Sequence, residues 1–294
     1  MMIACIDIGG TSLKVAVANE KAELFDQDIL PVKDNFDDFM DVIVNWVEEK
    51  KETYNIEGVA FSAPGAVDTV TGIIGGASAI PYIHGPNFKK IIKERLGLPC
   101  SIENDANCAA LAEVYSGAAK EYNDVCFVVI GSGIGGAVIK DGLVHHGKHL
   151  HGGEFGYMVV VDGEGNAQPI LSELASTQAM VRRVEARLPG EWNGKKIFEE
   201  AYNGNTVCKE EIETFYKYLA VGIYNIQYVY DPELIVVGGA ISKRKDLCKN
   251  IDRHMDMLLE KVKIAKVKPN IVSCEYHGDA NLIGAFVNYQ YEKH

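Results

Sequence analysis

The 294-residue sequence lacks the features of a membrane-spanning or secreted chain. No apolar run reaches the roughly 20 residues that a helix needs to cross a bilayer. No basic segment followed by an apolar stretch and a cleavage site opens the chain, which excludes a secretory signal from the interpretation. We therefore expect a cytoplasmic protein with no membrane contact.

The seven cysteines form no CxxC pair, and their number is odd. They are scattered along the chain, and several lie in apolar stretches, where cysteine behaves as a small core residue. This pattern argues against a disulfide framework and is typical of a protein from a reducing cytoplasm.

The sequence has fewer basic than acidic residues. The chain has 29 Lys and Arg against 41 Asp and Glu, which gives a formal net charge of −12. Such a balance argues against a nucleic acid or an anionic membrane as a partner. The negative charge is dispersed along the sequence, so we interpret it as a solubility feature. The length allows one large domain or two of ordinary size.

Glycine, in contrast, gathers at the ends of apolar segments. The first such turn is Ile6-Asp7-Ile8-Gly9-Gly10-Thr11, with apolar residues on both sides, a pattern that predicts strand, tight turn and strand. The backbone N–H groups of Gly9 and Gly10, the Thr11 hydroxyl and the Asp7 carboxylate suit a polyphosphate with Mg²⁺. The alternative is a β-hairpin whose turn simply needs glycine.

The same pattern returns in the second half of the chain. The apolar run Val125–Ile130 precedes Gly131-Ser132-Gly133-Ile134-Gly135-Gly136, and a strand resumes at Ala137. A third glycine turn, Gly238-Gly239, ends a later apolar segment. Two phosphate-type hairpins in one chain indicate a duplicated fold with a nucleotide between the copies.

Apolar periodicity predicts the remaining elements. We expect helices over 36–47 (capped by Asp34 or Asn35), 87–96, 108–116, 175–188, 208–230, 245–262 and 279–291. We expect further strands over 22–30, 59–61, 100–102, 234–237 and 270–274. Residues 72–83 show weak periodicity and predict an irregular loop, and a hinge is expected near Gly117.

Polar residues follow the strand predicted at 100–102, in the stretch Glu103-Asn104-Asp105-Ala106-Asn107. This places Asn104 or Asp105 at a helix N-terminus just past a strand end, where α/β folds place their chemistry. The alternative is a helix cap with no further role.

Four histidines lie within 145–151, close to Glu154, which stands between glycines. A metal site is one interpretation. A solvated loop is the alternative that we favour for most of these histidines, because no cysteine or carboxylate pair completes a tetrahedral set. The flexible backbone around Glu154 can present a single carboxylate.

Taken together, the motifs resemble the ROK family (repressors, open reading frames and kinases). The matching stretches occur in family order: Asp7–Thr11, Ala63–Gly65, Glu103–Asn107, Gly131–Gly136, Gly153–Gly156 and Val237–Gly239. The resemblance implies an α/β, two-domain, actin-like (ribonuclease H-like) ATPase fold with a central cleft that holds ATP and a sugar. It implies an N-terminal domain over 1–117, onto which a helix at 279–294 packs back, and a C-terminal domain over 118–278.

The resemblance also implies roles for single residues in the ATP-dependent phosphorylation of a hexose hydroxyl. Asp105 resembles the general base, and Asp7 would contact Mg²⁺ through water. Asn104, Glu154, Gly65 and Ser78 are the expected sugar contacts. The expected contacts to ATP are Gly9, Gly10, Thr11, Ser132 and Gly133 at the phosphates and Gly238 and Gly239 near the nucleoside.

Within the family, the motifs at Glu103 and Glu154 resemble those of β-glucoside kinases, and three features depart from the family pattern. Tyr157 stands where kinases of the family usually carry a histidine, and Ser172 stands where a glutamate faces the anomeric end of the sugar. No cysteine lies between Val161 and Leu174, so we expect no zinc site.

These departures favour a β-glucoside such as cellobiose as the acceptor, and a free monosaccharide is the alternative. A sugar-responsive transcriptional regulator is a rival from another class. We disfavour it because the first glycine hairpin opens the sequence, with no helix-turn-helix ahead of it. The resemblance is compatible with a homodimer.

Overall fold

The computed structural model describes residues 1–161 and 167–293. It forms two compact units. Unit 1 comprises Met1–Gly117, His146–His151 and Gly278–His294, and unit 2 comprises Ala118–His145 and Gly152–His277. Neither unit is continuous in sequence.

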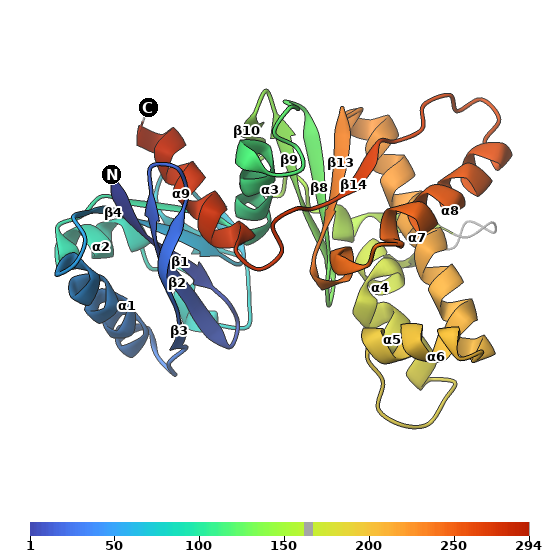
Figure 1. Cartoon of the computed structure of the whole chain (residues 1–294), viewed down its shortest axis with the longest axis horizontal. Coiled ribbons are helices and arrows are strands. Elements are labelled where there is room, and N and C mark those ends of the chain that lie inside the picture. The colour runs from blue at the N-terminus through green and yellow to red at the C-terminus, as the bar shows by residue number, and fades with distance from the viewer. Residues whose placement is uncertain (162–166, 294) are drawn as a thin grey trace. The chain divides into compact units, whose positions relative to one another are not determined.

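Unit 1 is built on a five-stranded sheet in the order β3-β2-β1-β4-β7 (Figure 1). Its strands are β1 (Met2–Ile8), β2 (Ser12–Asn19), β3 (Leu24–Pro31), β4 (Ile56–Ala63) and β7 (Cys100–Asn104). β1 and β2 form an antiparallel hairpin around the first glycine turn, whereas β1, β4 and β7 run parallel. The carboxyl ends of these three parallel strands therefore meet at one edge of the sheet.

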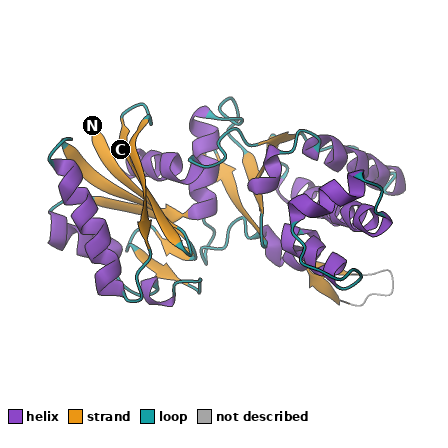
Figure 2. Cartoon of the chain, turned by 60° about the horizontal axis from the view of Figure 1, so that its bottom comes forward, coloured by secondary structure: helices purple, strands orange, loops and turns teal. Residues whose placement is uncertain are grey.

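Helices cover both faces of this sheet (Figure 2). The core on one face packs α1 (Phe36–Lys51) and α2 (Phe88–Leu96) on apolar strand residues. On the other face, α9 (Ala280–Lys293) contacts β1, β4 and β7 and packs against α3 (Asp105–Ser116). Two glycines allow this close approach: a Cβ on Gly58 would lie 2.2 Å from the Tyr289 hydroxyl, and one on Gly284 would lie 1.7 Å from the Cys108 carbonyl oxygen.

The helix boundaries of unit 1 follow local capping. The Asn35 side chain accepts from the Asp38 amide at the start of α1, and the Asn87 side chain accepts from the Lys90 amide at the start of α2. α2 ends at Gly97, whose φ of +71° lies in the left-handed region that glycine adopts without strain.

The irregular loop predicted over 72–83 is wrong. β6 (Ile73–Gly75) pairs antiparallel with β5 (Ala66–Asp68), and a 3₁₀ turn, η1, follows at Pro81–Ile83. Strands of three residues are too short to show a period of two, which is why the pattern did not reveal them.

Unit 2 has a five-stranded sheet in the order β10-β9-β8-β13-β14. Its strands are β8 (Val125–Ile130), β9 (Ile134–Lys140), β10 (Leu143–Val144), β13 (Leu234–Gly238) and β14 (Ile271–Ser273). β8 and β9 form the antiparallel hairpin, and β8, β13 and β14 are parallel. In both sheets, the five strands numbered in chain order lie side by side as third, second, first, fourth and fifth. This shared order agrees with a duplicated fold.

The core of unit 2 joins its sheet to the helices α4 (Leu171–Ala175), α5 (Thr177–Glu185), α6 (Gly194–Tyr202), α7 (Thr206–Tyr230) and α8 (Leu247–Lys261). A 3₁₀ turn, η3 (Ala240–Lys243), follows β13, and β11 (Val159–Val161) pairs with β12 (Ala167–Ile170). Part of the segment 161–174, for which the sequence predicts no zinc, lies outside the described residues.

The single helix predicted over 175–188 is wrong. Ser176 has an extended backbone, with φ −83° and ψ 160°, which separates α4 from α5. Its side chain accepts from the Ala179 amide and so caps α5. The helix α6 was not predicted, because only Ile197 and Ala201 of its residues are buried and they give a weak period.

Throughout the described parts of both units, no helix combines the length and apolarity needed to cross a membrane.

Candidate active site

Asp7 sits near the carboxyl edge of the unit 1 sheet. In the strand register it lies beside Ser62 of β4, which in turn lies beside Glu103 of β7. The Asp7 side chain is buried, and its Oδ1 accepts hydrogen bonds of 2.9 Å from the Ser62 hydroxyl and from the Asn281 amide of α9. Within residues 1–161 and 167–293, Oδ2 accepts none. Two neutral donors thus orient the carboxylate and leave one oxygen for a further ligand.

Glu103 is fully buried at the end of the neighbouring strand. Its Oε1 accepts from the Asn104 amide at 2.7 Å and from the Asn107 side chain at 2.9 Å. Its Oε2 lies 2.6 Å from Nε2 of His146. The hydrogen bond to this carboxylate raises the pKa of His146 above its usual value, partly opposed by burial.

Asn104 and Asp105 join β7 to α3. The Asn104 side-chain oxygen accepts from the Ala106 and Asn107 amides. Of the two candidates that the sequence offered, Asn104 is therefore the N-cap of α3. Its side-chain amide donates to the Gly65 carbonyl at 3.0 Å. Asp105 is the first residue of α3, and its Oδ1 accepts from the Ala106 amide. A carboxylate here is stabilised by the helix dipole.

Three carboxylates gather around Cys108, one turn into α3. Burial raises the pKa of this thiol well above its usual value, and the charges of Glu103, Asp7 and Asp105 raise it further. The structure therefore brings the predicted base and the predicted magnesium ligand into one acidic cluster.

Ser78 is held beside this region by His84. The Ser78 hydroxyl lies 2.9 Å from His84 Nε2, and the other ring nitrogen, Nδ1, lies 3.2 Å from the Gly75 carbonyl oxygen. A carbonyl only accepts, so the Nδ1 proton of His84 points at the Gly75 carbonyl. The same ring approaches Gly65: a Cβ there would lie 3.2 Å from His84 Cε1. Gly65, Ser78 and Asn104 thus form one connected group.

The first glycine turn closes through the Gly9 amide, which donates to the Ser12 carbonyl at 3.1 Å. A Cβ on Gly9 would lie 2.8 Å from that oxygen, so only glycine fits. Gly10 and Thr11 are exposed at the tip of the hairpin.

In unit 2, the second and third glycine turns meet. Gly238 pairs in register with Val129 of β8. Gly239 has a φ of +90°, and a Cβ on it would lie 2.2 Å from the Ile130 carbonyl oxygen, directly before the turn that contains Ser132 and Gly133. The predicted phosphate and nucleoside contacts of this unit are therefore adjacent.

Two cavities open beside these turns. One of about 550 Å³ is lined by Ser132, Ser172, Glu173 and Arg182. The other, of about 490 Å³, is lined by residues of α5, α6 and η3 that include Thr177, Phe198 and Arg244. The Arg244 guanidinium stacks 3.7 Å above the Phe198 ring centroid. Thr177 links the two features, because its amide donates to the Gly131 carbonyl at 3.0 Å.

Glu154 also belongs to unit 2. It is half-buried and directly precedes the 3₁₀ turn η2 (Phe155–Tyr157). Gly153 before it has a φ of +90°, and a Cβ there would lie 2.6 Å from the Ala137 Cα, so the backbone packs closely against β9.

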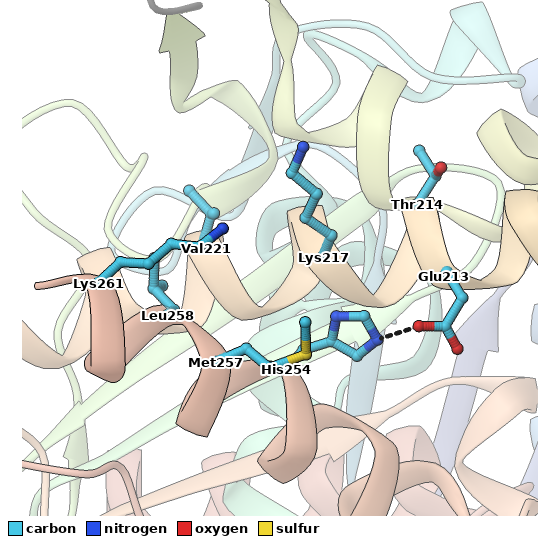
Figure 3. A pocket seen from close by; sticks show the side chains of 8 residues that line it. All are labelled: Glu213, Thr214, Lys217, Val221, His254, Met257, Leu258 and Lys261. Atoms are coloured by element: carbon cyan, nitrogen blue, oxygen red, sulfur yellow. Dashed lines mark ion pairs between the residues drawn. The ribbon is translucent and has the colours of Figure 1, made fainter.

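A groove between α7 and α8 contains none of the predicted site residues (Figure 3). In it, His254 Nε2 pairs with Glu213 Oε2 at 3.1 Å. In the part of the chain that the structure describes, no group of three or more His, Cys, Asp or Glu side chains is arranged to hold a metal ion.

Several residues at these sites were missed from sequence. Ser62 and Asn281, which orient Asp7, lie outside the glycine motifs and carry no local signal. His146 was grouped with the other histidines of 145–151; His145, His149 and His151 are exposed, as the solvated-loop interpretation expects. Arg182 lies on the helix α5 and Arg244 directly follows η3, and neither position carries a local signal of a site.

The comparison with known families decides the classification. The ROK family model matches residues 3–291. The chain belongs to the ROK family. A curated relative, the beta-glucoside kinase of Listeria monocytogenes, is 32% identical over 300 residues, which cover 100% of this chain and 99% of the relative.

Solved structures extend the ROK match. A ROK family protein from Streptococcus pneumoniae in complex with sucrose is 40% identical, with a TM-score of 0.92 and coverage of 100% and 99% of the two chains. A ROK glucokinase from Streptomyces griseus in complex with glucose and AMPPNP is 25% identical, with a TM-score of 0.77 and coverage of 97% and 98%. The predicted family, the actin-like ATPase fold and the class of enzyme, an ATP-using sugar kinase, are confirmed.

Proposed function

We propose that this ROK sugar kinase transfers the γ-phosphoryl group of ATP to the 6-hydroxyl of a hexose unit in a β-glucoside such as cellobiose. The observation that carries the reaction is the position of Asp105. Its carboxylate is at the first position of α3, directly after β7, whose last two residues are Glu103 and Asn104. The similarity to a beta-glucoside kinase over the whole chain supports this choice of acceptor.

In the proposed reaction, Asp105 takes the proton of the acceptor hydroxyl. The acceptor oxygen forms a bond to the γ-phosphorus as the bond from that phosphorus to the β–γ bridging oxygen breaks, and ADP leaves. A base that stays ionised at neutral pH suits this step, and the helix dipole at Asp105 favours the ionised form. Asn104 and Glu154 are proposed to hold sugar hydroxyls, and Gly65 and Ser78 are proposed as further sugar contacts.

Asp7 is the proposed contact to Mg²⁺ through water. Its fixed orientation and its second oxygen fit a cation that keeps most of its water ligands. When bound, Mg²⁺ neutralises charge on the transferring phosphates.

The exposed backbone of the glycine turns fits the phosphates of ATP. In unit 1 these residues are Gly9, Gly10 and Thr11. In unit 2 they are Ser132 and Gly133, where a Cβ on the neighbouring Gly131 would meet no atom within 4 Å. The cavity that follows Gly238 and Gly239 is the proposed nucleoside site, with Phe198 and Arg244 on its wall.

The choice of acceptor rests on Ser172. Its hydroxyl bonds to both the amide and the carbonyl of Ile134, so no long side chain and no carboxylate extends from this position. A shorter group leaves room for a second sugar on the anomeric oxygen. It also removes a hydrogen bond that would favour a free anomeric hydroxyl.

A coupled ADP-release assay over cellobiose, other β-glucosides, glucose and N-acetylmannosamine tests this proposal. We expect a higher kcat/KM for cellobiose or another β-glucoside than for glucose. A clear preference for a free monosaccharide would refute the acceptor, and the absence of ATP-dependent activity on every sugar would refute the reaction. The similarity to a glucokinase makes glucose the second candidate.

A further inference from the structure

The Glu103 carboxylate is a buried charge that the proposed reaction does not use. Its side chain is 1% exposed, whereas that of its partner His146 is 31% exposed. A buried carboxylate is costly unless it is paired and hydrogen-bonded. Glu103 meets this requirement with one backbone amide, one side-chain amide and one imidazole.

The two side-chain oxygens of Glu103 have different hydrogen-bond partners. Oε1 binds the backbone amide of Asn104 and the side chain of Asn107, so it fixes the turn from β7 into α3. Oε2 faces His146, which comes from a different part of the chain. Whatever holds Oε2 therefore also holds the junction on which Asn104 and Asp105 sit.

Charge makes His146 the decisive partner. The groups around Cys108 are the carboxylates of Glu103, Asp7 and Asp105, and a further carboxylate, Glu292 of α9, also acts on His146. The two other donors to Glu103 are neutral amides. Without His146, Oε2 of Glu103 would be buried without the hydrogen bond and the opposite charge that offset the cost of burying it.

We propose that His146 is a positioning residue for the phosphoryl transfer: it holds Glu103 in place, and through Glu103 it sets the positions of Asn104 and Asp105. This role rests on the proposed function, because it assigns Asn104 to the sugar and Asp105 to the acceptor proton. His146 itself acts through Glu103 and touches no reacting atom.

His146→Gln and His146→Ala test the role. Gln keeps an amide donor near the position of Nε2 but carries no charge, whereas Ala removes both. We expect kcat to fall roughly tenfold to a hundredfold in the Ala variant, with a smaller loss in the Gln variant. The KM for the sugar should rise, because Asn104 moves with the junction, and the KM for ATP should stay within about twofold.

The pH profile separates positioning from general destabilisation. As the pH rises through the raised pKa of His146, the wild-type kcat should fall with loss of the imidazolium. In the Gln variant, residue 146 does not titrate, so its kcat should not show this fall at high pH. His149→Ala is the matched control, because His149 lies exposed on the same segment. This variant should leave kcat and the KM values for the sugar and for ATP unchanged.

Hydrogen exchange gives a readout that does not depend on the sugar. In His146→Gln and His146→Ala, the amides of residues 104–107 should lose protection, while those of α1 keep theirs. Unchanged exchange at 104–107, or changed exchange with an unchanged kcat, would overturn the role of His146. An inactive wild type would refute the proposed function instead, and exchange alone would then decide the positioning role.

Discussion

The hydroxyl of Ser172 bridges the amide and the carbonyl of Ile134: it accepts from the nitrogen at 2.9 Å and donates to the oxygen at 3.2 Å. Ile134 is the first residue of β9, directly after the glycine turn that holds Ser132 and Gly133. A side chain from α4 therefore fixes the end of this turn.

Ser172→Ala should loosen the turn while leaving the fold intact. The variant loses two part-buried hydrogen bonds, each worth about 0.5–1.5 kcal/mol, so the KM for ATP should rise roughly threefold to tenfold, with little change for the sugar. Steady-state kinetics with each substrate varied in turn measures this. Thr214→Ala is the control, since its hydroxyl donates to the Glu210 carbonyl within α7 and away from the glycine turns. An unchanged KM for ATP in Ser172→Ala would show that the bridge does not support nucleotide binding.

Asp105→Asn should remove the proposed base and preserve the start of α3. The side-chain oxygen of Asn can still accept from the Ala106 amide, so the melting temperature should change little. Turnover should fall by about two orders of magnitude or more. Asp37→Asn, an exposed acid in the first turn of α1, is the matched control and should keep full turnover. If Asp105→Asn retains most of its activity, another group takes the proton.

Two histidines should give the two units opposite responses to pH. The pKa of His146 in unit 1 is raised, first by its hydrogen bond to Glu103, so its stabilisation is complete below the ordinary value of 6.5 and is lost as the pH rises through the raised value. The pKa of His254 in unit 2 is lowered, first by burial and then by Arg253, with Glu213 acting against them. The unfolded chain then binds more protons than the folded one as the pH falls toward and below 6.5, and stability is lost.

Each unit carries one tryptophan, which allows the two responses to be measured separately. Trp46 lies on α1 in unit 1, and Trp192 lies in unit 2. Urea unfolding followed by fluorescence in Trp192→Phe should show unit 1 gaining stability between about pH 8 and about pH 6. In Trp46→Phe, unit 2 should lose stability over the same range. Parallel responses in the two variants would contradict these assignments, and His146→Gln and His254→Gln should each flatten the response of its own unit.

Gly284→Ala should destabilise unit 1. The new Cβ would lie 1.7 Å from the Cys108 carbonyl oxygen, so α3 and α9 must separate, at a cost of about 2–3 kcal/mol. Chemical denaturation with Trp46 as the reporter measures the loss. Gly278→Ala adds the same methyl group where no atom lies within 4 Å and should be close to neutral. Equal stability of the two variants would mean that the helices are not packed as closely as described.

Metal analysis tests the expected ions. Purified protein should contain no stoichiometric zinc by elemental analysis, because residues 161–174, where the family resemblance places a zinc loop, include no cysteine. Activity should require Mg²⁺ and disappear on its removal with a chelator. One tightly held zinc per chain would return attention to the histidines of 145–151.

Short-range signals allowed much of the fold to be predicted. Glycine turns between apolar strands gave both hairpins, and apolar periodicity gave α1, α7 and α8. Where the signal needs length, as in the three-residue strands β5 and β6, prediction failed. It failed again at Ser176, where one residue with an extended backbone divides a continuous helical pattern into two helices.

The candidate site also contains residues that the sequence allowed us to predict and residues that it did not. Asn104 and Asp105 stand out because polar residues follow a strand and precede a helix. Their supports do not stand out: Ser62, Asn281 and His146 reach the site through strand register and tertiary packing, which no local pattern encodes. The motif gave the residues proposed to act, and the structure adds those that hold them.

The packing of α9 against α3 has a consequence for how the molecule is made. All of unit 2 lies between these two helices in the sequence, so a ribosome must synthesise unit 2 before α9 is available to cover the unit 1 sheet. Until then, the face with Gly58, Asp7 and Glu103 lacks its cover, although most of unit 1 has already emerged. Unit 2 can close on local contacts, whereas unit 1 begins first and finishes last, and an exposed sheet during that interval is a surface that chaperones recognise.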